Sequence, residues 1–138
     1  RSSAGKKRTR NRNIVIMPAK ILIVEDEEPI RRMLRRVLEQ TGYTVLEAEN
    51  GVSAEGVFRE EDPDLVITDL IMPEGEGIEL IRSLKKIDPE AKIFAISGGG
   101  RIGPESYLPI ALRMGAIKAF QKPLRIGELL AALSAALG

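Results

Sequence analysis

The chain has 138 residues and a formal net charge of +1, with 43% hydrophobic and 30% charged residues, as in an ordinary soluble globular protein of one domain. It contains neither cysteine nor histidine, which excludes disulfides, thiol nucleophiles, cysteine-based zinc sites and imidazole general bases. No apolar run reaches the length of a membrane span and no signal peptide is visible, so we expect a cytoplasmic protein without membrane association.

The first 16 residues carry a charge of +6 and include no acidic residue. The rest of the chain has 15 basic and 20 acidic residues, which leaves it a net charge of −5. Because Met17 directly precedes the first apolar run, where a start codon would fit, we interpret residues 1–16 as a disordered basic extension or an expression remnant and residues 17–138 as the folded domain. An acidic body suits DNA poorly, so we expect no direct binding of nucleic acid.

Apolar runs and helical periodicities alternate along the rest of the chain. The run at 21–24 predicts a buried strand and is followed at once by the acids Glu25 and Asp26. Apolar residues then recur at intervals of three and four over positions 30–38, which predicts an amphipathic helix that ends at Gly42. Four arginines of this helix are expected to face water: Arg31, Arg32, Arg35 and Arg36.

A short strand is expected around Val45, and a turn at Asn50 and Gly51 leads from it into a second helix. The central strand is predicted at 65–68, because this apolar run, rich in β-branched residues, lies between two prolines. Asp69 ends the run. A carboxylate at that point lies where an open parallel sheet places its ligand crevice.

Three helices and two strands complete the predicted pattern. Helices are expected at Ile78 to about Ile87, at Tyr107–Met114 and at about 126–137, and strands are expected to end at Ser97 and Gln121. Three glycines at 98–100 offer backbone amides, but no Lys-Ser or Lys-Thr follows them, so the segment is not a P-loop. The fivefold alternation predicts an α/β doubly wound, five-stranded parallel sheet with five helices.

Polar side chains follow four of the predicted strands at their carboxyl ends, namely Glu25 with Asp26, Asp69, Ser97 and Lys122. Each has an ordinary alternative as a cap, a turn residue or a solvated charge. Three converging carboxylates would take up protons unless a cation held them, and oxygen ligands of this kind suit Mg²⁺ together with an anionic partner. A nucleophilic carboxylate, acids for a metal and a lysine are what an aspartyl-phosphate site needs.

The motifs ILIVEDE, DLVITDLIMPEGEG, FAISG and FQKP occur in this order within residues 20–137. The chain thereby resembles the response-regulator receiver domain of two-component signalling, in its single-domain, chemotaxis-regulator-like form. The resemblance implies a flavodoxin-like fold and a switch that takes a phosphoryl group from a histidine kinase or phosphotransfer protein in the presence of Mg²⁺. It also implies slow self-dephosphorylation rather than a metabolic activity.

The family's catalytic positions correspond to three residues of this sequence. By the resemblance, Asp69 is the phosphoacceptor, Ser97 is the hydroxyl residue that moves toward the phosphoryl group, and Lys122 contacts that group. The bond between Lys122 and Pro123 is expected to be cis, as the family implies and as X-Pro chemistry permits.

The family's metal positions correspond to four residues. By the resemblance, Asp26 is the principal acidic ligand of Mg²⁺, and Glu25 acts through water. Asp69 contributes its own carboxylate, and Ile71 gives its backbone carbonyl to the ion.

Two departures from the family affect the expected output. The residue three before the lysine is usually an aromatic that reports activation, but here it is Ala119, with Phe120 beside it. The segment from Ser97 to Lys122 is also a few residues longer than usual. We expect a downstream protein target on the face from the fourth helix to the fifth strand, and a monomer or weak dimer.

Several alternatives remain open. A degenerate receiver that binds partners without phosphorylation is motivated by Ala119 and the added glycines. A Mg²⁺-dependent phosphatase of the haloacid-dehalogenase type would need a second aspartate where this chain has Ile71. DNA binding through residues 1–16 would be salt-sensitive and lost on their removal. The sequence fits a stand-alone receiver and equally a receiver cut from a longer regulator or hybrid kinase.

Overall fold

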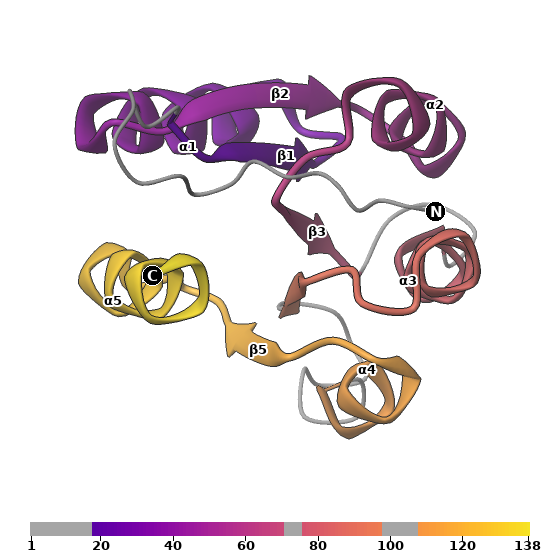
Figure 1. Ribbon diagram of the computed structural model, residues 1–138. Coiled ribbons are helices and arrows are strands. Elements are labelled where there is room, and N and C mark those ends of the chain that lie inside the picture. The colour runs from indigo at the N-terminus through magenta and orange to yellow at the C-terminus, as the bar shows by residue number, and fades with distance from the viewer. Residues whose placement is uncertain (1–17, 71–75, 98–107) are drawn as a thin grey trace.

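The structure is a computed structural model that describes residues 18–70, 76–97 and 108–138 (Figure 1). The strands of these residues are β1 Lys20–Val24, β2 Thr44–Ala48, β3 Leu65–Asp69, β4 Ile93–Ser97 and β5 Lys118–Gln121. The helices are α1 Glu28–Thr41, α2 Gly51–Glu61, α3 Glu76–Ile87, α4 Leu108–Met114 and α5 Ile126–Leu137. All strand pairs are parallel and follow the order β2-β1-β3-β4-β5, so the predicted doubly wound fold is confirmed.

Different helices cover the two faces of the sheet: α1 and α5 lie on one face, and α2, α3 and α4 lie on the other (Figure 1). Successive side chains of a strand point to opposite faces. In β1, Ile23 therefore packs in one cluster with Leu38 of α1 and Leu129 of α5, whereas Val24 belongs to the other cluster with Phe58 of α2. Among the helices in the described ranges, none has the length and apolar character needed to cross a membrane.

The ends of two helices show how local sequence sets their limits. Gly42 ends α1 in the left-handed conformation, with φ of 109°, as predicted. The predicted turn at Asn50 and Gly51 is wrong in its detail, because Gly51 already begins α2. Asn50 is instead the N-cap, and its side chain accepts a 2.8 Å hydrogen bond from the backbone N–H of Ser53.

The arginines of α1 do not all face water. Arg32 forms an exposed ion pair with Glu28 one turn away. Arg31 has a side chain that is only 14% exposed, and its Nε lies 2.9 Å from Oε1 of Glu47 on β2. Arg35 also binds Glu47. The expectation of four solvated arginines is therefore wrong for Arg31, because an acid on the neighbouring strand holds its guanidinium against the protein.

The strand register brings the predicted site residues to one edge of the sheet. Strands β1 and β3 pair up to the residues just before Glu25 and Asp69, which therefore lie side by side. On the other side of Asp69, the backbone N–H of Lys122 donates a 2.9 Å hydrogen bond to the carbonyl of Ser97. The strand order reverses direction between β1 and β3, and such a reversal opens a crevice at the carboxyl ends of the strands.

Candidate functional site

Three carboxylates form a cluster at the edge of the sheet where the strands have their carboxyl ends. Glu25 and Asp26 follow β1, Asp69 ends β3, and one carboxylate oxygen from each lies within 4.8 Å of the others. Glu25 and Asp69 are buried, whereas Asp26 is exposed. The cluster is thus open to solvent on the side of Asp26. Oxygen donors with one solvent-facing carboxylate fit Mg²⁺, which usually retains several waters.

The electrostatics of Glu25 also fit a cation. Burial first, and then the negative charge of Asp69, raise the pKa of Glu25 from 4.5 to about 7. Two contacts act in the opposite direction: the backbone N–H of Glu27, which donates to Oε2 of Glu25 at 3.1 Å, and the charge of Lys122. These two contacts lower the pKa of Glu25 by less than burial and charge repulsion raise it. A divalent ion would supply the missing positive charge, because opposite charge favours the ionised form.

Lys122 brings a positive charge to the cluster. It follows β5, and its Nζ lies 3.3 Å from Oδ2 of Asp69 and 3.9 Å from Oε1 of Glu25. The bond between Lys122 and Pro123 is cis, as predicted. The ammonium lies close enough to the Asp69 carboxylate to contact an anionic group attached to it.

Ser97 contributes a buried hydroxyl. It ends β4, one residue beyond Ile96, which pairs with Asp69 across the sheet. Ser97 is fully buried, and its Oγ has no hydrogen-bond partner within the described part of the chain. Buried hydroxyls are nearly always hydrogen-bonded, so one without a partner next to a site calls for an explanation. A ligand oxygen at Asp69 would provide one.

Some predicted features lie outside the described residues. These are the proposed carbonyl ligand Ile71, the glycines at 98–100 and the first residue of the predicted fourth helix, Tyr107. The metal roles of Glu25, Asp26 and Asp69 and the catalytic roles of Asp69, Ser97 and Lys122 stay predictions. Their common location at one sheet edge is a structural fact.

Sequence reasoning missed two residues that support the site. Gly77, in the first turn of α3, lies so close to β3 that a Cβ on it would fall 2.4 Å from the carbonyl oxygen of Asp69. Arg31 donates a hydrogen bond from Nη1 to the carbonyl oxygen of Glu25 at 2.7 Å. The sequence places Gly77 in a loop before a helix from Ile78, and this is wrong, because α3 already begins at Glu76. Neither Gly77 nor Arg31 gives a sequence signal, because their contacts with β3 and β2 depend on how the helices pack on the sheet.

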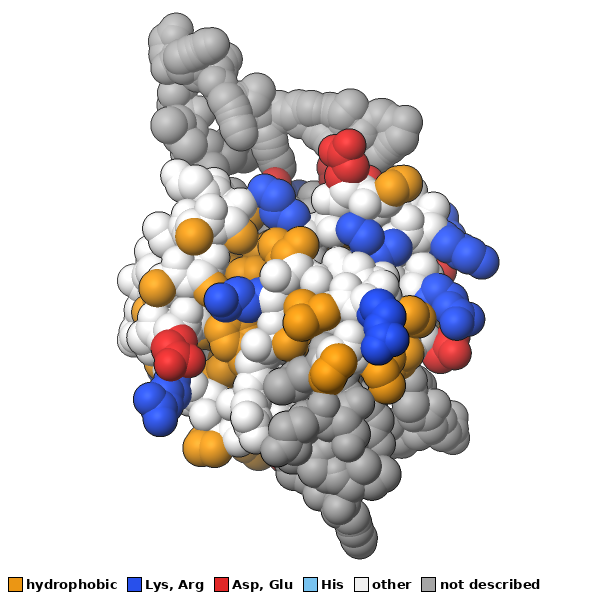
Figure 2. Space-filling model, turned by 90° about the horizontal axis from the view of Figure 1, so that it is seen from below, with side chains coloured by type: hydrophobic (Ala, Val, Ile, Leu, Met, Phe, Trp, Pro, Cys, Tyr) orange, Lys and Arg blue, Asp and Glu red, His pale blue; other side chains and the backbone are white. Residues whose placement is uncertain are grey.

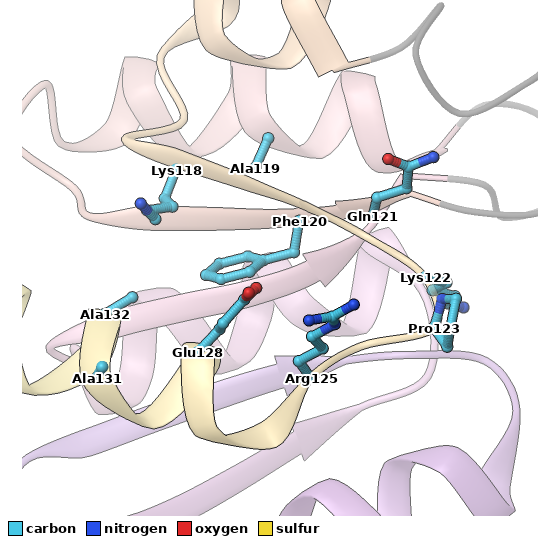
Figure 3. Close-up of a pocket in the computed structure, with 10 residues that line it drawn as sticks. All are labelled: Lys118, Ala119, Phe120, Gln121, Lys122, Pro123, Arg125, Glu128, Ala131 and Ala132. Atoms are coloured by element: carbon cyan, nitrogen blue, oxygen red, sulfur yellow. The ribbon is translucent and has the colours of Figure 1, made fainter.

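The surface formed by α4, β5 and α5, at the bottom of Figure 1, carries both apolar and basic side chains (Figure 2). A hollow beside β5 is lined by Lys118, Phe120, Arg125 and Glu128, among others (Figure 3). The exposed apolar side chains at and near α4 are Ile110, Leu112 and Ile117, with exposed fractions of 42%, 49% and 49%. This surface combines features of a protein contact, since apolar area lies beside a few charges.

Comparisons with known proteins agree with this geometry. The family model described as the response regulator receiver domain matches residues 21–134. The chain is 40% identical over 111 residues to the chemotaxis protein CheY of Halobacterium salinarum, which covers 78% of this chain and 90% of that protein. It is 33% identical over 114 residues to the sporulation initiation phosphotransferase F of Bacillus subtilis, which covers 83% of this chain and 90% of that protein.

A solved structure supports the same assignment. The response regulator receiver domain protein from Clostridium thermocellum superposes with a TM-score of 0.78 at 32% identity, over 86% of this chain and 93% of that one. The match therefore covers the sheet, the helices around it and the acidic edge together. The chain belongs to the response regulator receiver domain family.

Proposed function

We propose that the chain is a phosphorylation-dependent switch that accepts a phosphoryl group on Asp69. Receiver domains are signalling proteins that interact with histidine kinases or phosphotransfer proteins and with downstream targets, not metabolic enzymes. The observation that carries the proposal is the Asp69 carboxylate clustered with two further acids, with the Lys122 ammonium 3.3 Å from it. The chain has no histidine, so the donor supplies the phosphohistidine.

In the proposed transfer, a carboxylate oxygen of Asp69 attacks the phosphorus, and the phosphorus–nitrogen bond to the donor imidazole breaks. The imidazole keeps the electron pair and takes up a proton. Lys122 holds a phosphoryl oxygen through its ammonium, and the buried hydroxyl of Ser97 donates to another. Glu25, Asp26 and Asp69 would hold Mg²⁺, which neutralises charge on the phosphoryl oxygens when bound. Slow attack by water on the acyl phosphate returns the carboxylate.

The modification acts as a switch because of the charge it adds. A phosphoryl group brings nearly two negative charges to a buried position and biases an equilibrium between two arrangements of the surrounding segments. A coupling of about 1–3 kcal/mol changes the affinity for a partner by roughly 5- to 150-fold. Partner binding should in turn favour phosphorylation by the same factor, because such coupling is reciprocal.

The proposed target surface is the face from α4 to β5. Its support is the exposed apolar group Ile110, Leu112 and Ile117, with the basic Lys118 next to Ile117 in the chain. A downstream protein with apolar and acidic contact residues would complement this surface. With it we propose a monomer or weak dimer in the cytoplasm, and residues 17–138 as the domain that carries the switch.

Intact mass measurement after incubation with acetyl phosphate and Mg²⁺ tests the proposal. Wild type should gain one phosphoryl group, and Asp69→Asn, which keeps the size but lacks the nucleophilic carboxylate, should gain none. Asp88→Asn is the matched control, because Asp88 caps the turn between α3 and β4 at the opposite edge of the sheet. Chelation of Mg²⁺ should abolish labelling. No gain on wild type, or an equal gain on Asp69→Asn, would discard the proposal.

A second candidate is a degenerate receiver that binds its partner without phosphorylation. Ala119 favours it, because it stands on β5 where a receiver usually has an aromatic side chain. This candidate expects the same partner affinity for wild type and Asp69→Asn, with or without acetyl phosphate. The phosphorylation switch expects a difference, so one binding measurement on both proteins distinguishes the two.

A further inference from the structure

We propose that Arg31 is a positioning residue for the acidic cluster, which it orients by holding the backbone between Glu25 and Asp26. The inference rests on the proposed function, because it assumes that the cluster binds a divalent cation. Arg31 touches neither the cluster's carboxylates nor Lys122 among the contacts of the described residues. It acts through the main chain.

The contacts of Arg31 connect the acidic loop, residues Glu25 and Asp26 after β1, to strand β2. Its Nη1 donates to the carbonyl oxygen of Glu25 at 2.7 Å, and its Nε donates to Oε1 of Glu47 at 2.9 Å. The side chain is 14% exposed, so these bonds are made largely away from solvent. A planar guanidinium presents donors in fixed directions, which lets one residue hold two acceptors in a defined geometry.

The carbonyl that Arg31 holds controls the direction of Asp26. The carbonyl of Glu25 lies in one rigid plane with the N and Cα atoms of Asp26, because the peptide bond is planar. On its other side, the N–H of Glu25 donates to the carbonyl of Ala48 at 3.1 Å. The main chain of Glu25 is therefore held to β2 at both ends: directly through Ala48, and through the pair of Arg31 and Glu47.

Glu47 keeps Arg31 in this position. It also accepts a hydrogen bond from Arg35. This bond, as the largest cause, and the bond from Arg31 hold the pKa of Glu47 below its usual value. Glu47 is thus a carboxylate that stays ionised and anchors the guanidinium. Arg35 shares Glu47 with Arg31, and the hydrogen bonds of the described residues link it to Glu47 and Glu39 but not to the acidic loop.

The direction in which the Mg²⁺ affinity changes when Arg31 is substituted distinguishes a positioning role from a purely electrostatic one. A positive charge near a cation site weakens cation binding, so loss of the Arg31 charge alone would tighten the binding of Mg²⁺. Loss of the tether, the two hydrogen bonds from Arg31 to Glu25 and Glu47, would weaken the binding of Mg²⁺, because Glu25 and Asp26 would no longer be held in the arrangement the ion needs. Substitution of residues that orient metal ligands typically costs about 10- to 100-fold in affinity.

The test is a calorimetric titration of Mg²⁺ into wild type and variants at one ionic strength. Arg31→Gln and Arg31→Lys should both bind Mg²⁺ about tenfold more weakly. The lysine variant keeps the charge, but a compact ammonium cannot hold both acceptors. Arg35→Gln is the matched control: it removes an ion pair with the same Glu47, leaves Glu47 to Arg31 alone, and should keep the affinity within about twofold.

Other outcomes would overturn the inference. Unchanged affinity in Arg31→Lys would mean that charge alone matters, and equal weakening in Arg35→Gln would point to a general loss of stability. Tighter binding in Arg31→Gln would also reject the tether. If the Arg31 variants do not fold, Glu47→Gln should weaken Mg²⁺ binding in the same direction, with faster hydrogen exchange at the N–H of Glu27. Absence of Mg²⁺ binding by wild type would instead reject the metal site of the proposed function.

Discussion

The metal-depleted protein should lose stability as the pH rises from 4.5 to about 7. The cause is Glu25, whose pKa is raised from 4.5 to about 7 by its burial and then by the charge of Asp69. Over this range the folded chain keeps a proton on Glu25 that the unfolded chain has released, so acid favours folding and the contribution disappears above the folded pKa. At about 1.4 kcal/mol per pKa unit, the loss in the free energy of unfolding is about 3 kcal/mol.

Urea unfolding followed by circular dichroism, in steps from pH 4.5 to pH 7 with a chelator present, measures this loss. Glu25→Gln should remove the decline, since its amide does not titrate. Mg²⁺ should restore stability at pH 7, because a ligand that binds only the folded state stabilises it. Below pH 4.5 the trend should reverse, because Glu47 has a lowered pKa and its ion pairs are lost as it becomes protonated. A flat profile for wild type, or the same decline in Glu25→Gln, would refute the reasoning.

Three substitutions test the packing around the site by urea unfolding. Gly77→Ala should lower the free energy of unfolding by about 1–3 kcal/mol and slow labelling by acetyl phosphate, because its Cβ would fall 2.4 Å from the carbonyl oxygen of Asp69. Gly127→Ala in α5 is the control and should leave the free energy of unfolding unreduced, because a Cβ there has no atom within contact distance. Phe120→Ala should cost about 3–5 kcal/mol, since it empties a buried ring position. Asn50→Ala should cost about 1 kcal/mol through the lost helix cap. A loss with Gly127→Ala as large as with Gly77→Ala would contradict the steric argument.

The fold could be predicted because its inner strands are buried on both faces. All five residues of β3 and all five of β4 are buried, so these strands appear in the sequence as continuous apolar runs between turn residues. The last helix, Ile126–Leu137, has the predicted limits. Met33 lies in the predicted apolar stripe of α1 but is 42% exposed. Helical periodicity predicts which side of a helix faces the core, but it does not predict how much of that side the neighbouring elements cover.

The candidate site could be predicted as far as side chains at strand ends determine it. The parallel order of the strands gathers Glu25, Asp69 and Lys122 at one edge without further information. The supporting residues could not be predicted in this way. Arg31 and Glu47 are 16 positions apart, and only the packing of α1 on β2 brings them together. Long-range pairs of this kind leave no local pattern.

The aromatic side chain on β5 faces α5 and not α4. Because side chains alternate along a strand, Phe120 packs in the cluster that contains Phe94 and Leu129, whereas Ala119 packs with the cluster on the other face, as does Met114 of α4 (Figure 3). Phe120 could take the place of a ring at position 119 only through a one-residue slip of β5, which would turn every side chain of the strand to the opposite face. The proposed switch therefore cannot depend on the rotation of an aromatic ring that β5 itself places on its α4 side, and the proposed coupling from Asp69 to α4 would have to involve other groups.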